Sequence, residues 1–245
     1  MAKALFELNP GIDRGAAAER FARDTRVQIR DVLTDETARE IRSILAQATP
    51  WGMGWQAGID GEPQGARREQ LQDNTAQPIL REIAESTHRA AMQGDYAFRY
   101  GRYPMVDAYR EKWAEGGPHD LLVEYLNTPE TLELVREVTG IPELVKADAQ
   151  ATLFAPGHFL GRHIDSHVED GWQVAYVLNF APGDWHPDWG GYLNFLDEDG
   201  DIVAGYRPRF NTLNMFKVPQ PHLVSFVPPF APAGRFAITG WFRDK

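Results

Sequence analysis

The residues best suited to chemistry are two histidines and one aspartate. His163 and Asp165 form an H-x-D pair, and His222 begins a later predicted strand. Side chains two positions apart project from the same face of an extended chain. An imidazole and a carboxylate from one strand edge, together with a distant imidazole, can bind iron(II) on one face and leave three adjacent positions open. We therefore predict that His163, Asp165 and His222 are metal ligands and form the catalytic centre.

A basic residue follows the second histidine and falls in the next predicted strand. Arg235 lies thirteen residues after His222, in the last predicted strand. A charged side chain inside a barrel is costly unless it meets an anion. The guanidinium group can pair with a carboxylate through two parallel hydrogen bonds. A dicarboxylate cosubstrate would supply that anion, and Thr239, four residues later on the same strand face, can donate a hydroxyl to it.

The elements that must position these residues differ between the two parts of the chain. Residues 11–140 have a mostly helical pattern, with helices expected after Thr34, at Pro78 and between Thr128 and Gly140. From residue 146 the period becomes two. Short strands are expected at 147–154, 172–180, 191–196, 202–206, 211–216, 222–227 and 235–242.

This order predicts an α+β fold. Residues 146–245 should form an antiparallel jelly roll, or double-stranded β-helix, as the catalytic core. Residues 1–145 should form a supporting helical region of the same compact domain. Residues 51–74 are polar and rich in glycine, which favours a long loop, and Asp199-Gly200 favours a hairpin turn.

Composition narrows the class of protein. The chain has 245 residues, a net charge of -10 and no cysteine, which excludes disulfides, thiolate metal sites and cysteine nucleophiles. The negative charge disfavours direct binding to nucleic acid and favours a basic protein partner. The sequence contains no apolar run long enough for a membrane span and no secretion signal. We therefore expect a cytoplasmic protein that does not bind membranes.

Four stretches of the C-terminal part resemble one family. They are Ala155-Pro-Gly-His-Phe-Leu-Gly-Arg-His-Ile-Asp165, Trp189-Gly-Gly-Tyr-Leu193, Asn211-Thr-Leu-Asn-Met-Phe216 and Gly234-Arg-Phe-Ala-Ile-Thr-Gly-Trp241. Together they resemble the 2-oxoglutarate/iron(II) oxygenases of the prolyl hydroxylase type, and the ribosomal prolyl hydroxylases most of all. The resemblance implies Fe(II), 2-oxoglutarate as cosubstrate and O2, with ascorbate as a candidate addition.

The resemblance also implies a reaction and further site residues. It predicts a dioxygenase that hydroxylates a prolyl residue in a protein or peptide. Phe154 and Ala237 depart from the family pattern, because relatives often carry tyrosine and Ser or Thr there. Tyr176 matches another tyrosine position of the family and can replace the lost hydroxyl as a cosubstrate contact. The aromatic loop at residues 185–189 and the loop at 51–74 are expected to flank an open substrate groove.

Other interpretations remain open from the residues. The three ligands could form a buried His–Asp hydrogen bond, and Arg235 could form a structural ion pair. His158, His167 and His186 are weaker candidates for the site. The chain could be a hydroxylase of a small molecule, a cupin-like metal enzyme that uses no 2-oxoglutarate, or a binding module without activity. The sequence makes no prediction of the oligomeric state.

Overall fold

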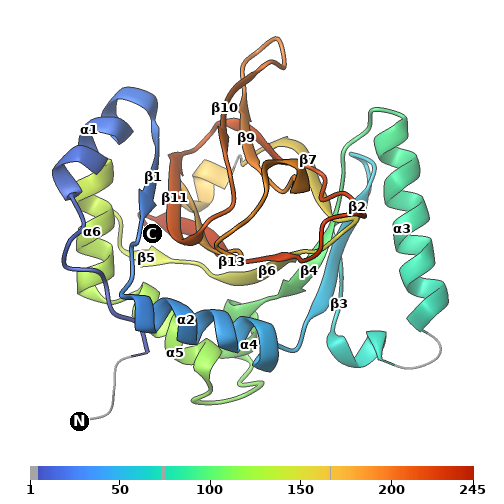
Figure 1. Ribbon diagram of the computed structural model, residues 1–245, viewed down its shortest axis with the longest axis horizontal. Coiled ribbons are helices and arrows are strands. Elements are labelled where there is room, and N and C mark those ends of the chain that lie inside the picture. Colours follow the sequence, from blue (N-terminus) through green and yellow to red (C-terminus); the bar gives the residue numbers. More distant parts are fainter. Residues whose placement is uncertain (1–4, 73–75, 166) are drawn as a thin grey trace.

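The computed structural model describes residues 5–72, 76–165 and 167–245 (Figure 1). Within these residues thirteen strands join one antiparallel sheet that curls into a barrel, in agreement with the predicted jelly roll. The strand order is β1-β11-β8-β13-β6-β4-β7-β12-β9-β10, with β2, β3 and β5 attached at the sides. The strands are β1 Arg26–Arg30, β2 Gly52–Ala57, β3 Gln64–Ala66, β4 Ala97–Tyr103, β5 Lys146–Ala147, β6 Gln150–Phe154, β7 Phe159–Ile164, β8 Trp172–Phe180, β9 Leu193–Leu196, β10 Ile202–Tyr206, β11 Phe210–Lys217, β12 Pro221–Val224 and β13 Arg235–Arg243.

Helices from the N-terminal half surround the barrel, with α2, α4 and α5 below it in the view of Figure 1. Their bounds are α1 Arg14–Asp24, α2 Asp35–Ser43, α3 Ala76–Met92, α4 Met105–Arg110, α5 Pro118–Leu126 and α6 Pro129–Thr139. The sixth has the expected ends: Thr128 accepts a hydrogen bond from the Thr131 amide, and Gly140 adopts φ 69°. In the described part of the chain, no helix is both long and apolar enough to cross a membrane.

The main hydrophobic core lies between the helices and the outer face of the barrel. It contains Leu45, Leu122 and Val135 from the helical side and Leu178, Ile238 and other strand residues from the sheet side. Alternation along each strand leaves the opposite side chains to face the barrel interior. The large sheet therefore has one face that stabilises the fold and one face that is available for a site.

The N-terminal half also supplies strands, which the helical pattern did not indicate. β1 pairs with β11, and β4 joins β6 to β7. The loop predicted over residues 51–74 is wrong for 52–57 and 64–66, which form the β2–β3 hairpin against β4; Asn74 lies outside the described residues. A Cβ on Gly52 would stand 2.0 Å from the Ala66 carbonyl oxygen, so glycine is required where the two strands meet.

One buried amide connects the N-terminal strand to the barrel. Asn211, which begins the N-x-L-x-x-F motif, accepts a hydrogen bond from the Leu33 amide at 3.0 Å. Its own amide group donates to the Leu33 carbonyl oxygen at 2.7 Å. Asn211 is fully buried and has φ 51°, a conformation that asparagine tolerates better than most residues. This residue of the motif therefore stabilises the fold.

We predict that Asn211→Ala lowers the free energy of unfolding by about 3 kcal/mol or more. The substitution leaves the buried amide and carbonyl of Leu33 unpaired and puts alanine in the left-handed region. Denaturant unfolding measures the change. Asn214→Ala is the matched control, because it removes one hydrogen bond from the half-buried Gln28 and should cost about 1 kcal/mol. Equal losses in the two variants would contradict this role.

Candidate metal centre

The barrel interior contains a cavity of about 510 Å³. Its walls are the inward side chains of β4, β6, β8 and β13, together with residues of β7 and β12. All six predicted site residues line the cavity, namely His163, Asp165, His222, Arg235, Tyr176 and Thr239. Thr239 lies on the same face of β13 as Arg235.

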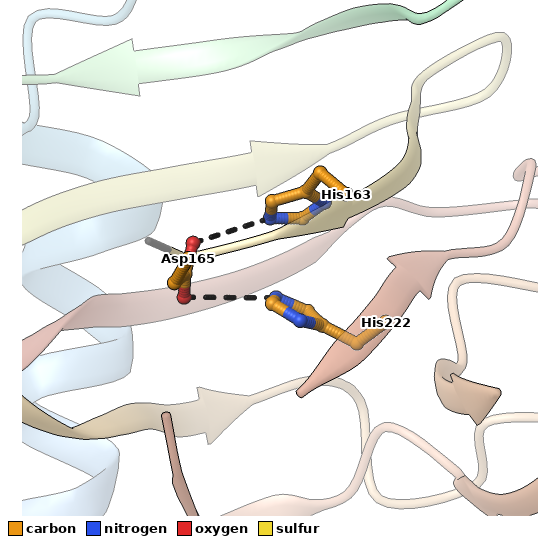
Figure 2. Close-up of side chains that lie close together, drawn as sticks. All are labelled: His163, Asp165 and His222. Carbon is orange, nitrogen blue, oxygen red and sulfur yellow. Dashed lines mark ion pairs between the residues drawn. The ribbon is translucent and has the colours of Figure 1, made fainter. Parts of the chain in front are cut away.

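Strand pairing brings the three predicted metal ligands together. β7 and β12 are antiparallel neighbours, and His163 stands directly opposite His222 in their register. Asp165 follows the end of β7, and Figure 2 shows its carboxylate facing both imidazoles. Its oxygens lie 3.5 Å from Nε2 of His163 and 3.8 Å from Nε2 of His222. One ligand atom from each residue lies within 4.8 Å of the others, a spacing that suits a shared cation.

Both imidazoles are oriented by the backbone. Nδ1 of His163 lies 3.0 Å from the Gly161 carbonyl oxygen, and Nδ1 of His222 lies 2.9 Å from that of Gln220. A carbonyl oxygen only accepts hydrogen bonds, so each Nδ1 carries the proton and each Nε2 presents its lone pair to the centre. Burial and the neighbouring His163 lower the pKa of His222 to about 4, so this ring is neutral at neutral pH. A metal requires that neutral form.

The carboxylate is also fixed by a side chain of β13. Nε1 of Trp241 donates to Oδ2 of Asp165 at 2.9 Å. The Trp241 indole stacks on Trp172, with ring centroids 3.7 Å apart. Burial alone would raise the pKa of Asp165, but the pKa lies below its usual value, and the hydrogen bond from the Trp241 indole is one cause. Asp165 is therefore ionised at neutral pH, as a metal ligand must be.

Arg235 is a buried cation with only a neutral partner. Its side chain is 2% exposed, and Nη1 donates to Oδ1 of Asn179 at 2.9 Å. The guanidinium lies over the Phe154 ring, 4.7 Å from its centroid, and the buried Nε has no hydrogen-bond partner. Burial lowers the pKa of Arg235 to about 9, which leaves it charged at neutral pH. Among the residues that the structure describes it forms no ion pair, so it has donors left for an anion.

The other two predicted cosubstrate contacts, Tyr176 and Thr239, have different environments. Tyr176 borders the cavity with its ring, but its hydroxyl donates to the Asp148 carbonyl oxygen at 2.7 Å. The ring also packs against Phe242 in the main core on the helical side of the sheet. Its hydroxyl proton is thus used within the fold, whereas the Thr239 side chain is half-buried at the cavity wall.

Two of the weaker histidine candidates, His158 and His186, lie apart from the centre. Nδ1 of His158 is bound between the Ala155 amide and the Leu153 carbonyl. His186 is on the surface and caps a short helix by accepting from the Asp188 amide. The side chain of His167 lies outside the described residues.

The loop at 185–189 does not form the expected groove wall. Trp185 is buried in a cluster with Phe154 and Val224, and its indole donates to the Gly190 carbonyl. Trp172 and Trp241 are the tryptophans that line the cavity. The expected wall was wrong because an exposed aromatic loop and a buried one have similar composition, and only packing distinguishes them.

Sequence reasoning missed an inner wall formed by β4. Phe98 and Tyr100 face the cavity, and Tyr100 stacks on Phe154 with centroids 5.1 Å apart. Gln150 and Trp241 complete that side. The alternation of Phe98, Tyr100 and Arg102 was the available signal, but it lies in a stretch whose flanks have helical periodicity.

Comparison with known proteins agrees with this geometry. Residues 149–243 match the family model described as the 2OG-Fe(II) oxygenase superfamily. A prolyl-4-hydroxylase from Pseudomonas putida has a similar structure, with TM-score 0.56, 19% identity and coverage of 94% of this chain and 98% of the other. An oxidoreductase of the 2OG-Fe(II) oxygenase family from Burkholderia pseudomallei is similar as well, with TM-score 0.58, 14% identity and coverage of 100% of this chain and 97% of the other.

A third similar structure contains a peptide. It is a prolyl hydroxylase from Trichoplax adhaerens in complex with a hypoxia inducible factor oxygen degradation domain peptide fragment, with TM-score 0.59, 16% identity and coverage of 94% and 89%. At these identities the structures establish the fold. A search of curated protein sequences finds no significant match. The fold predicted from the motifs is confirmed, and residues 149–243 match the family that the motifs resemble.

The unpaired charge of Arg235 leads to a prediction about stability. Without ligands, Arg235→Met should be at least as stable as the wild type, because it removes the cost of burying a cation. With Mn(II) already bound, addition of 2-oxoglutarate should raise the melting temperature of the wild type further and leave that of the variant unchanged. Arg39→Met, on an exposed helix face, is the control and should change stability by less than about 0.5 kcal/mol. A loss above about 2 kcal/mol in unliganded Arg235→Met would indicate a structural role instead.

Proposed function

We propose that this protein is an Fe(II)- and 2-oxoglutarate-dependent dioxygenase that hydroxylates a prolyl residue in a polypeptide, because residues 149–243 match the model of the 2OG-Fe(II) oxygenase superfamily. The observation that carries the proposal is the combination of two features in one cavity. One is a group of two imidazoles and a carboxylate whose ligand atoms lie within 4.8 Å of one another. The other is a buried arginine that lacks an anionic partner. A cupin-like enzyme without 2-oxoglutarate would not need the second feature.

Each side chain has a defined task in this proposal. His163, Asp165 and His222 would hold iron(II) through Nε2, a carboxylate oxygen and Nε2, and Trp241 would keep the carboxylate oriented. Arg235 would bind the carboxylate of 2-oxoglutarate that is remote from the metal, and Thr239 can add a hydroxyl contact. Tyr176 would contribute its ring to the wall, because its hydroxyl already donates to Asp148.

The cofactors supply the oxidising chemistry: iron(II), 2-oxoglutarate and O2 together insert one oxygen atom into a C–H bond and release succinate and carbon dioxide. The protein contributes position and environment. Trp172, Trp241 and Phe98 line the cavity and exclude water from it. The fixed Nδ1–H bonds keep both imidazoles in one tautomer, so the ligands need no rearrangement to bind metal.

Two observations favour a prolyl residue in a polypeptide as the substrate. Two of the similar structures are prolyl hydroxylases, and one of them contains a peptide. The stacked indoles of Trp172 and Trp241 present flat apolar surfaces beside Asp165, which suit a pyrrolidine ring. A free small molecule is the alternative substrate, and the second experiment below distinguishes the two.

We predict that His163→Ala, Asp165→Ala and His222→Ala each abolish succinate release and weaken Mn(II) binding, with the fold intact. Three ligands are needed for the metal, whereas the hydrophobic core lies on the other face of the sheet. Calorimetric titration measures Mn(II) binding, circular dichroism measures the fold, and a succinate assay measures turnover. His186→Ala should behave as the wild type, because that histidine is exposed and outside the cavity. Normal turnover by a well-folded His222→Ala variant would remove His222 from the ligand set.

For the substrate, we predict that proteins gain one oxygen atom on proline when the enzyme acts on a lysate. The lysate should come from a strain that lacks the enzyme, and iron and 2-oxoglutarate should be added. Mass spectrometry of digested proteins locates the modified residue, and His222→Ala serves as the inactive control. Oxygen gained by a free amino acid or small metabolite, with none on protein, would establish the alternative.

A further inference from the structure

The cavity that contains the candidate metal ligands continues into a groove at the barrel mouth. The groove has a volume of about 380 Å³ and extends past the β2–β3 hairpin to α4. Cavity and groove share seven lining residues, among them Tyr100, Gln150 and Trp241. A polypeptide with one residue at the metal can therefore place neighbouring residues along this groove.

The groove is basic, although the chain as a whole is acidic. Three arginines line it, Arg102, Arg110 and Arg243, against two carboxylates, Asp107 and Asp148. Arg243 pairs with Asp148 at 3.3 Å. Within the described part of the chain, Arg102 and Arg110 form no ion pair, which leaves the groove with an excess positive charge in a protein of net charge -10.

Arg102 is oriented by neutral groups. Its Nε donates to Oε1 of Gln150 at 2.8 Å. The stem crosses the hairpin at Gly54, where a Cβ would stand 3.2 Å from Cδ of Arg102. The rest of the guanidinium can therefore donate to an anion, and a charged acceptor gives the strongest such bond.

This anion site is separate from the one at Arg235. Gln150 lies opposite Thr239 in the pairing of β6 with β13, and Thr239 is four residues from Arg235. Four residues of strand span roughly 13 Å. A 2-oxoglutarate bound at Arg235 and the metal would thus lie within the barrel and leave Arg102 available to another molecule.

We propose that Arg102 recognises an acidic side chain of the polypeptide substrate, near in sequence to the residue that is hydroxylated. The inference rests on the proposed function. The occupant is a polypeptide because the groove continues beyond Arg102 to Arg110 on α4, and a free amino acid at the metal would leave that length unfilled. Charge complementarity with the excess arginines selects an acidic residue.

The experiment measures peptide binding apart from turnover. Peptides with a central proline carry Glu, Gln or Lys at one flanking position at a time. Their affinity for the protein loaded with Mn(II) and 2-oxoglutarate is measured by fluorescence anisotropy without oxygen. Turnover of the same peptides with iron and oxygen is followed as succinate release. For the wild type we expect Glu to bind about tenfold more tightly than Gln at one position, and the difference to shrink at high salt.

Variants assign that preference to one side chain. Arg102→Gln should abolish the preference, Arg102→Lys should keep most of it, and Arg102→Glu should reverse it in favour of Lys. The reversal cannot arise from a loss of stability. Arg39→Glu is the matched control, because it changes the net charge equally on an exposed helix and should retain the preference for Glu.

The outcomes separate this inference from the proposed function. An absent preference in the wild type, or a preference for Glu that persists in Arg102→Glu, would overturn the role of Arg102, even if proline-dependent turnover stands. If the peptides with Glu bind more tightly but turnover does not depend on the central proline, the role of Arg102 is supported and the prolyl residue is rejected as the site of hydroxylation. If free glutamate or free proline competes with the labelled peptide as well as an unlabelled peptide does, the proposal that a polypeptide occupies the groove is wrong.

Discussion

The antiparallel alternation of β13 is the constraint on which the rest of the molecule depends. Arg235, Ala237, Thr239 and Trp241 face the barrel interior, and Ile238 and Phe242 between them enter the core beneath the helices. One strand thus provides the candidate anion-binding arginine at one end and the indole that bonds to Asp165 near the other. A shift of one residue in its pairing with β8 would exchange these two sets. The core and the candidate site are therefore stabilised by the same register.

The candidate centre combines groups that are costly to bury separately. Two imidazoles are held in one tautomer by backbone carbonyls, and an ionised carboxylate lies beside them. Arg235 is charged and shares its buried surroundings with Asn179 and an aromatic ring. Such an arrangement favours binding of a cation at one end and an anion at the other, because each ligand offsets a cost that the fold already carries. This is the physical reason that the cavity suits a metal and a dicarboxylate together.

Net charge and local charge lead to different expectations about the substrate. The net charge of -10 determines the electrostatic field far from the protein surface, and this field favours the approach of a basic protein. The groove beside the centre contains unpaired arginines, which favour an acidic side chain next to the target residue. Both statements can hold for one partner, since long-range attraction and local recognition involve different surfaces. The local charge follows only from the folding of β4 and α4 against β13.

The sequence by itself predicted the candidate metal ligands and determined the fold class, because both depend on short-range patterns. The H-x-D spacing puts His163 and Asp165 at one strand end, the strand pattern after residue 146 indicated a jelly roll, and Arg235 stood out as a charge in a buried strand. Tertiary structure decided what depends on distant pairing. β4, although flanked by helical sequence, became a cavity wall because Phe98 and Tyr100 meet strands more than fifty residues away. Tertiary structure also determined that the Tyr176 hydroxyl donates to Asp148 and that the Trp241 indole donates to Asp165. Hydrogen-bond partners must be close in space, and spacing along the chain does not reveal which distant residues are close.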